Sequence, residues 1–193
     1  AEANKIKFHE FIYDNLKILD FGCGGGYLLN EFNFKIDKYG VEINDDARNV
    51  AIQNGLKCYK SSKELPSTYF DLIISNNTLE HCENPFLELK ELYRSLKKNG
   101  KICVVVSLDS LNYKYKSNDI NFHLYSWSPM NLGNILKACN FEVISSKPFI
   151  HKWFPHYYKV KKIIPWWLFH FLCYIYGRLN KKYSQTKAVA IKK

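Results

Sequence analysis

A glycine-rich turn after a short apolar strand constrains the fold of this chain more than any other feature. The expected strand, residues 17–21, carries the acid Asp20 close to its end. The glycines that follow, at every second position, are Gly22, Gly24 and Gly26. Glycine adopts positive φ angles without steric cost and lets the backbone approach a ligand where a Cβ atom would block it. The pattern therefore predicts a strand, a tight ligand-binding turn and a helix over residues 26–33.

The turn differs from the fingerprint of dinucleotide-binding proteins. That fingerprint, G-x-G-x-x-G, places a pyrophosphate on the N-terminus of the following helix. Here the pattern is Asp-x-Gly-x-Gly-x-Gly, with the carboxylate of Asp20 in front. Because a carboxylate repels phosphate and attracts positive charge, we expect a cationic ligand. The alternative, a tight turn without any ligand, stays open on this motif alone.

A second acid follows the next apolar run, about 20 residues beyond Asp20. Glu42 ends the strand expected at residues 38–42. A carboxylate at such a strand tip can accept hydrogen bonds from both ribose hydroxyls of a nucleoside. The alternative role of Glu42 is to stabilise the N-terminus of the helix expected at residues 45–54. The glycine turn before it favours the ribose role.

The chain resembles the class I S-adenosylmethionine-dependent methyltransferases in the order and spacing of its motifs. The matching motifs are the glycine turn, Glu42, the block at 70–81 and the block at 96–106. The resemblance covers roughly residues 16–145 and a last strand near 187–191. It implies an α/β fold: a Rossmann-like, seven-stranded, mostly parallel sheet with helices on both faces and an antiparallel last strand. It also implies S-adenosyl-L-methionine as the cofactor and S-adenosyl-L-homocysteine as the product.

The resemblance also assigns the contacts with the cofactor. The residues expected to bind it are Asp20, Gly22, Gly24, Gly26, Glu42, Ile43, Ser61, Ser62 and Asn76. The turn faces the methionine half, Glu42 takes the ribose, Ile43 packs on the adenine, and Asn76 lies near the sulfonium. Many family members carry an acid for the adenine amino group after the third strand. This chain offers Ser61 and Ser62 there instead.

Two histidines are the candidates for a general base, because their pKa range suits proton transfer near neutral pH. His81 follows the fourth expected strand, and His123 precedes the helix expected at 129–139. The alternative for either is structural support, which weighs more for His81 because its Leu-Glu-His triplet recurs across the family. The residues expected to shape the acceptor pocket are Tyr125, Trp127 and Trp153. No metal is expected, because no histidine–carboxylate cluster with ligand spacing is visible and Asp109 and Asp119 stand apart from other ligands.

Length and alternating apolar runs predict a single α/β domain over residues 1–193, which the resemblance implies is a methyltransferase domain. Expected strands cover 17–21, 38–42, 56–59, 70–75, 101–107, 141–149 and 186–192, and expected helices cover 4–14, 26–33, 45–54, 85–97, 129–139 and 163–180. A helical insertion at residues 150–185 separates the sixth and seventh strands. The insertion is rich in aromatic residues and lysine. Three roles remain open for it: a cap over the acceptor, a membrane contact, or a helix packed on the sheet or on a second subunit.

The charge of the chain is strongly positive, +10 from 28 basic and 18 acidic residues. The excess of positive charge lies after residue 145, where no acid occurs, and this favours an anionic partner or a solvated lysine-rich surface.

A transmembrane helix is not expected, because the longest apolar stretch has about 14 residues and spanning a membrane needs about 20. The six cysteines form no C-x-x-C pairs, so we expect a reducing, cytoplasmic environment, with or without membrane association. The sequence gives no signal of oligomeric state.

The resemblance implies a methyltransferase that uses S-adenosylmethionine, and we expect a small-molecule acceptor. O-methylation of a sugar, a phosphorylated precursor or a quinone-like ring is the interpretation we favour. The basic tail leaves an RNA or protein methyltransferase open, but nucleic acid is not the expected partner. Members that methylate base amino groups usually carry an Asn/Asp-Pro-Pro-aromatic motif, whereas this chain has Asn76-Asn77-Thr78-Leu79. A cofactor-binding protein without catalytic activity is the third alternative.

Overall fold

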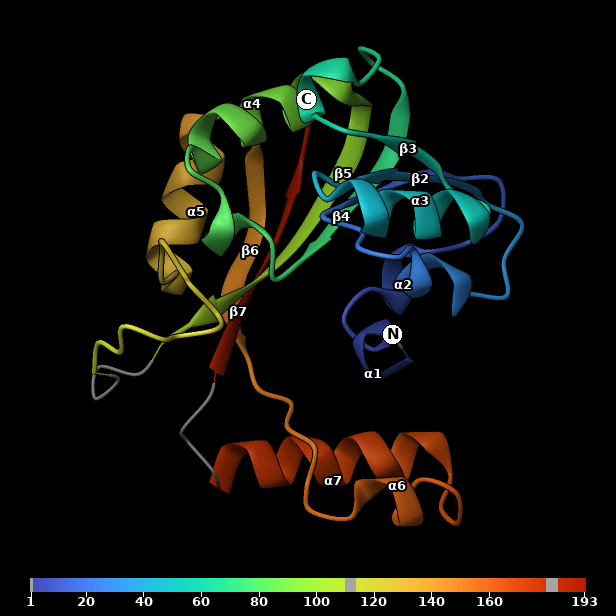
Figure 1. The fold of residues 1–193 in the computed structure, drawn as a ribbon, viewed down its shortest axis with the longest axis vertical. Coiled ribbons are helices and arrows are strands. Elements are labelled where there is room, and N and C mark those ends of the chain that lie inside the picture. The colour runs from blue at the N-terminus through green and yellow to red at the C-terminus, as the bar shows by residue number, and fades with distance from the viewer. Residues whose placement is uncertain (1, 110–113, 180–183) are drawn as a thin grey trace.

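The computed structural model describes residues 2–109, 114–179 and 184–193 and forms one seven-stranded sheet (Figure 1). The strands are β1 (Lys17–Phe21), β2 (Asp37–Val41), β3 (Lys57–Tyr59), β4 (Phe70–Asn76), β5 (Leu96–Leu108), β6 (Glu142–Phe149) and β7 (Ser184–Ile191). Their order across the sheet is β3-β2-β1-β4-β5-β7-β6. The first five pair in parallel, and β7 pairs antiparallel with both β5 and β6. The predicted fold, including the antiparallel last strand, is confirmed.

Helices and short helical turns connect the strands. The α-helices are α1 (Glu2–Lys5), α2 (Tyr27–Asn30), α3 (Asp45–Gln53), α4 (Pro85–Ser95), α5 (Pro129–Ala138), α6 (Tyr157–Val160) and α7 (Trp166–Leu179). The 3₁₀ turns are η1 (His9–Phe11), η2 (Ser62–Glu64) and η3 (Leu79–His81). Asn84 and Ser128 cap α4 and α5, each accepting a hydrogen bond from a backbone N–H of the first turn. A proline follows each cap, as the sequence predicts.

The sheet is buried on both faces, which explains its nearly continuous apolar strands. On one face Leu19, Ile73 and Val104 join the core beneath α4 and α5. On the other face Ile18 and Ile74 join a second core with residues of α2, α3 and the N-terminal segment. Figure 1 shows α4 and α5 on one side of the sheet and α1, α2 and α3 on the other. This packing places the ends of β1, β2, β4 and β5 at one edge, where a ligand is reached from outside the sheet.

The N-terminal segment differs from the predicted helix at residues 4–14. It forms only the four residues of α1 and the three of η1, and the chain between them turns inward. Phe8 and Ile12 are buried in the second core, so tertiary packing fixes this segment in place of a continuous helix. The helix predicted at 26–33 is also shorter in the structure, and α6 was not predicted.

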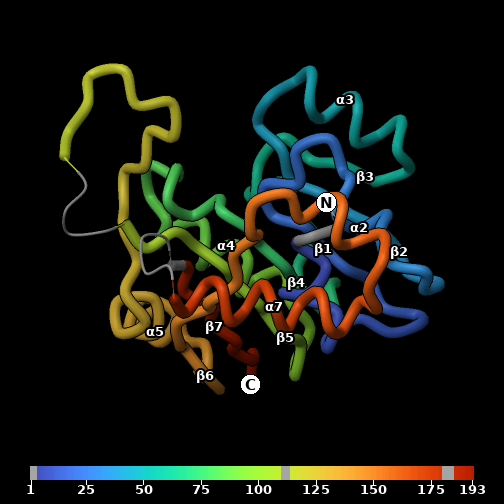
Figure 2. The backbone as a smooth tube through the Cα atoms, turned by 90° about the horizontal axis from the view of Figure 1, so that it is seen from below, coloured from blue at the N-terminus to red at the C-terminus, as the bar shows by residue number. Residues whose placement is uncertain are grey.

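The insertion between β6 and β7 lies beyond the end of the sheet. Figure 1 shows α6 and α7 below the sheet, and Figure 2, which views the molecule from below, shows α7 crossing in front of the strands. The Trp166 indole meets the His9 ring edge to face, with ring centroids 5.7 Å apart. Helix α7 begins after Pro165, whose carbonyl accepts from the backbone N–H of Phe169. Within the described residues, no helix combines the length and the apolar character that crossing a bilayer requires.

Candidate functional site

The turn after β1 is built from glycines in the left-handed region. Gly22 has φ +78° and Gly24 has φ +52°. A Cβ atom on Gly22 would lie 2.2 Å from Oγ1 of Thr78, which itself donates a hydrogen bond to the carbonyl of Phe21. A Cβ atom on Gly24 would meet no protein atom within 4 Å. Gly22 is therefore required by packing, whereas Gly24 faces open space.

Gly26 has a packing role of its own. Its φ is +76°, and a Cβ atom there would approach Leu56 and the backbone of Ala51 at 3.0 and 3.1 Å. The glycine thus lets α2 begin against α3. Gly26 is absent from the lining of the neighbouring cavity, so the structure explains it without a direct ligand contact.

A cavity of about 220 Å³ opens beside this turn. Its lining residues are Asn4, Asp20, Gly22, Cys23, Gly24, Gly25, Tyr27, Leu28 and Asn76. Of the residues predicted to bind the methionine half or to lie near the sulfonium, the structure thus brings Asp20, Gly22, Gly24 and Asn76 together. They come from the ends of β1 and β4, which pair in parallel.

The charge in the cavity is set by a buried acid. Asp20 is only 2% exposed, and burial raises the pKa of its carboxyl from 3.8 to about 7, with the negative charge of Glu42 adding to the rise. Removing water disfavours the charged form of an acid unless a positive group compensates. The cavity therefore favours a ligand that brings a positive charge to Asp20.

Glu42 lies one strand further along the same edge. Its two carboxylate oxygens accept hydrogen bonds from the backbone N–H groups of Gly24 and Asn44, both at 2.9 Å. The side chain thus joins the glycine turn to the start of α3. A ribose that binds here would compete with these two N–H groups for the same oxygens.

The residues predicted for the adenine end lie in three different environments. Ile43 is exposed next to Glu42. Ser61 caps η2, because its Oγ accepts from the N–H of Lys63 at 3.3 Å. Ser62 is buried, and its Oγ has no hydrogen-bond partner. None of the three lines the cavity beside the glycine turn.

Lys7 belongs to this site, and the sequence did not reveal it. Its Nζ donates to Oδ1 of Asn76 at 2.7 Å, and the residue is buried. Burial lowers the pKa of the Lys7 ammonium to about 7, while the negative charge of Glu80 acts in the opposite direction. The chain contains many lysines, and Lys7 stands alone between Ile6 and Phe8, so no pattern marks it. The N-terminal segment therefore contributes a buried amino group, with its pKa lowered to about 7, to the end of β4.

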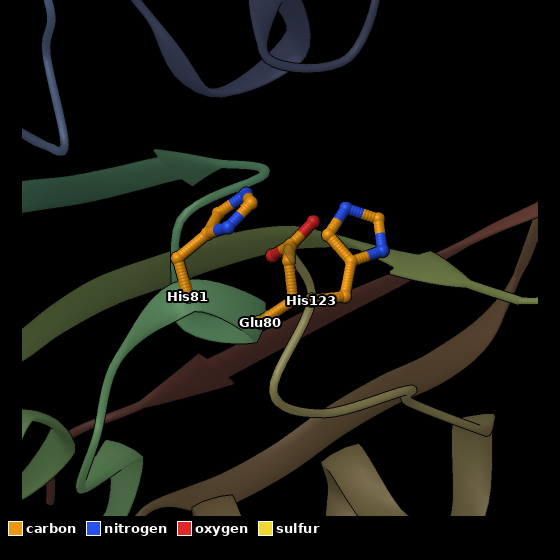
Figure 3. A group of neighbouring side chains, drawn as sticks. All are labelled: Glu80, His81 and His123. Atoms are coloured by element: carbon orange, nitrogen blue, oxygen red, sulfur yellow. The ribbon is translucent and has the colours of Figure 1, made fainter. Parts of the chain in front are cut away.

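A second group of side chains lies at the end of β4. Glu80, His81 and His123 each offer one ligand atom, and these atoms lie within 4.8 Å of one another (Figure 3). The carboxylate of Glu80 lies between the two imidazole rings in Figure 3. The ring centroids of His81 and His123 are 5.0 Å apart. Ligand spacing in the sequence does not show this cluster, because the fold brings His123 to Glu80 and His81 from a distant segment. The expectation that no metal is needed stays a prediction.

His123 is oriented by an acid that the sequence placed apart from other ligands. Its Nδ1 lies 3.2 Å from Oδ1 of Asp109, just beyond the end of β5. A carboxylate that accepts from Nδ1–H leaves Nε2 as the basic nitrogen in the neutral ring. Phe122, directly before His123, has φ +47°, which is unfavourable for a bulky residue and marks a constrained turn.

The loop that carries His123 is tied to η3 and β5 by its backbone. The carbonyl of Glu80 accepts from the N–H groups of Leu124 and Tyr125, at 2.8 and 3.2 Å. The N–H of Asp109 donates to Oγ of Ser126 at 2.9 Å. These bonds hold the two histidines next to each other without a ligand.

A second cavity, of about 280 Å³, is lined in part by His123. Its lining residues are Asp109, Lys114, Tyr115, Lys116, Ser117, Asp119, Phe122 and His123. Two lysines and two aspartates lie in this lining, so it presents both signs of charge in equal number.

Three residues predicted to shape an acceptor pocket are absent from this lining. The hydroxyl of Tyr125 donates to the carbonyl of Glu83, and Trp127 is buried in the core beneath α4 and α5. Trp153 lies in the insertion against Tyr157, with ring centroids 4.0 Å apart. Contact of these residues with an acceptor stays a prediction.

Comparison with known proteins places this site in a family. A model of a methyltransferase domain matches residues 4–146, which is most of the chain and excludes the insertion and β7. Ubiquinone biosynthesis O-methyltransferase of Rickettsia canadensis (strain McKiel) is 31% identical over 144 residues, covering 69% of this chain and 60% of that protein. Phosphoethanolamine N-methyltransferase 3 of Arabidopsis thaliana is 31% identical over 99 residues, covering 46% of this chain and 20% of that protein. The chain spans between 20% and 60% of the length of these relatives.

Solved structures agree in fold. The methyltransferase bound to the Haloferax volcanii Trm112 methyltransferase activator has a TM-score of 0.74 at 14% identity, covering 99% of this chain and 88% of that one. Haemonchus contortus phosphoethanolamine N-methyltransferase 2, solved with phosphomonomethylethanolamine and S-adenosylhomocysteine, has a TM-score of 0.69 at 14% identity, covering 98% and 52%. With the family match over most of its length and the glycine turn at the end of β1, the chain belongs to the class I S-adenosylmethionine-dependent methyltransferases, whose cofactor is S-adenosylmethionine.

Proposed function

We propose that the protein transfers a methyl group from S-adenosylmethionine to an oxygen atom of a small, anionic acceptor. The observation that carries this proposal is the His123–Asp109 pair in the lining of a cavity. The other cavity, lined by the glycine turn and Asp20, is the one that would hold the cofactor. The cofactor supplies an electrophilic methyl group on a sulfonium, and the residues of the chain supply binding, orientation and a base.

The cofactor side of the proposal rests on the first cavity. The buried carboxylate of Asp20 suits a positively charged methionine half, and the open space above Gly24 admits a ligand against the backbone. Glu42 presents two carboxylate oxygens that can exchange their backbone donors for ribose hydroxyls. Ile43, Ser61 and Ser62 then face the adenine end. Gly22 and Gly26 act by shaping the turn.

The acceptor side rests on His123 and the second cavity. A hydroxyl must lose its proton as it attacks the methyl group, and a positioned histidine accelerates such a step by about 10²–10⁴-fold. Asp109 keeps the basic nitrogen of His123 free for that proton. A cavity of about 280 Å³ is close to the lower size of small-molecule pockets. The net charge of the chain, +10, supports an acceptor with a phosphate or another acidic group.

Two relatives support a small acceptor without fixing the atom that is methylated. The Rickettsia protein is named an O-methyltransferase of ubiquinone biosynthesis, and the Arabidopsis protein is named a phosphoethanolamine N-methyltransferase. The paired histidine and aspartate favour oxygen over nitrogen here, because a hydroxyl gains more from a base than an amine that arrives neutral.

The insertion at 150–185 is part of the proposed single domain and acts as a cap that also touches a membrane surface. One stripe of α7 is exposed and apolar, including Trp167 at 66% and Phe171 at 55% exposure. Lysines on α6 and the following turn, and the lack of acids after Glu142, add a positive charge. Aromatic side chains beside lysines suit the interface of an anionic membrane.

The proposal is tested by methyl transfer to a panel of phosphorylated alcohols, sugars and quinol-like rings, read as a mass gain. His123→Ala is expected to lower turnover by about 10²–10⁴-fold while leaving S-adenosylhomocysteine affinity within about twofold. His81→Ala is the comparison, because His81 is the other base candidate and is expected to have the smaller effect. Products methylated on nitrogen, or on RNA or protein, would refute the proposal. Wild-type turnover in His123→Ala would assign the base elsewhere.

A further inference from the structure

The cluster of Glu80, His81 and His123 contains a buried acid that is incompletely satisfied. Glu80 is 0% exposed. Its Oε1 accepts from the backbone N–H of Ser107 at 3.0 Å, but its Oε2 has no hydrogen-bond partner. The negative charge of Glu80 acts to raise the pKa of Lys7, but the Nζ of Lys7 donates its hydrogen bond to Asn76 and not to Glu80. Leaving a buried polar atom unpaired is costly, and more so for a charged group, so this oxygen favours a cation.

One of the two nitrogen donors beside this oxygen, that of His123, is already oriented. His81 is exposed next to Glu80 in η3, and His123 is held over η3 by the bonds from Leu124 and Tyr125 to the Glu80 carbonyl. Asp109 accepts from Nδ1 of His123, so Nε2 carries the free lone pair. A carboxylate on the far nitrogen of a histidine is the usual support of a metal-ligating imidazole. Figure 3 shows the carboxylate of Glu80 between the two rings.

We propose that Glu80, His81 and His123 bind a divalent first-row transition metal ion, with Zn²⁺ as the best match. Two imidazoles and one carboxylate form a ligand set that zinc uses when a further position stays open. Magnesium fits less well, because it prefers oxygen ligands in a near-ideal octahedron. The ligand atoms lie within 4.8 Å of one another and would close in slightly around an ion.

The inference rests on the proposed function for its consequence, because the open position would face the acceptor cavity that His123 lines. A bound ion would attract an anionic acceptor and lower the pKa of a hydroxyl that it contacts. His123 would then act as a ligand, and the ion would replace it as the group that favours the ionised acceptor. In the metal-free protein His123 remains the base.

The test is direct metal binding by the chelator-stripped, full chain. Zn²⁺ is titrated by calorimetry and by competition with a chromophoric chelator, and Co²⁺ is used as a spectroscopic probe of the ligand set. One Zn²⁺ per chain with a Kd below about 1 μM is expected. Asp109→Asn is expected to weaken binding by about 10–100-fold, since it removes the negative charge of the group that orients His123. Glu80→Gln and His123→Ala are expected to weaken it further and to change the visible bands of Co²⁺.

Matched controls are Glu83→Gln and His156→Asn, which remove an exposed carboxylate and an exposed imidazole outside the cluster. They are expected to bind Zn²⁺ as the wild type does. Thermal melting and S-adenosylhomocysteine binding verify that each variant is folded. Zinc binding that is weaker than about 1 μM in the wild type, or equal in all variants, would overturn the inference. Methyl transfer that persists in chelator without any zinc binding would overturn the inference alone and leave the proposed function standing.

Discussion

Replacing Gly24 by alanine separates the ligand contact of the glycine turn from its backbone strain. Gly24 has φ +52° and open space where a Cβ atom would lie. Gly55, in the loop after α3, is the matched control, with φ +87° and equally open space. An alanine in the left-handed region costs about 1–2 kcal/mol. Both variants are therefore expected to melt roughly 2–8 °C below the wild type, since about 1 kcal/mol shifts Tm by about 2–4 °C at this chain length.

Only Gly24→Ala is expected to weaken cofactor binding. Its methyl group projects into the cavity of about 220 Å³, where the ligand must approach the backbone. We expect at least a tenfold loss of S-adenosylhomocysteine affinity, about 1.4 kcal/mol, in calorimetry well below both melting temperatures. Gly55→Ala is expected to bind as the wild type does. Wild-type affinity in Gly24→Ala would show that the turn faces away from the cofactor, and equal losses in both variants would assign the effect to strain.

Three further outcomes are expected. The pKa of Asp20 is raised to about 7 in the free protein, and binding of the cationic cofactor must expel the proton that Asp20 holds at lower pH. The affinity for S-adenosylmethionine, measured by calorimetry, is therefore expected to fall as the pH drops below about 7. Asp20→Asn is expected to remove this pH dependence of the affinity. Glu42→Ala is expected to lower the affinity for S-adenosylmethionine by roughly 10–150-fold, which corresponds to about one charge-assisted hydrogen bond. The loss is no larger because the carboxylate of the free protein already accepts two backbone hydrogen bonds. An unchanged affinity would refute the ribose contact. Replacing Trp167 and Phe171 together by serine abolishes co-sedimentation with anionic vesicles, and wild-type binding in that variant would contradict the membrane contact.

Much of the sheet could be predicted because its strands are buried on both faces. Runs such as Leu72 to Ser75 and Ile102 to Val106 are apolar almost without interruption, and capping residues mark where α4 and α5 begin. The acids Asp20 and Glu42 were visible because each stands at the tip of such a run. Their local sequence is enough to place them at the edge of the sheet.

The remainder depends on contacts between distant segments. Lys7 reaches Asn76 only because Phe8 and Ile12 anchor the N-terminal segment in the core, which no local pattern announces. His123 meets His81 through hydrogen bonds from a loop to the Glu80 carbonyl. Residue types alone identified the histidines as candidates, but the partnership with Glu80 and Asp109 required the fold.

The position of β7 links the insertion to the integrity of the sheet. Strand β7 lies between β5 and β6, yet residues 150–183 separate it from β6 along the chain. Closing a loop of that length costs about 2 kcal/mol more than closing a hairpin of about four residues. A ligand or lipid surface that holds the insertion in its folded arrangement offsets part of this entropic cost of closing the loop. It is therefore expected to slow the opening of β7. The rate of amide hydrogen exchange along β7 would therefore show whether a ligand or a lipid surface is bound to the insertion.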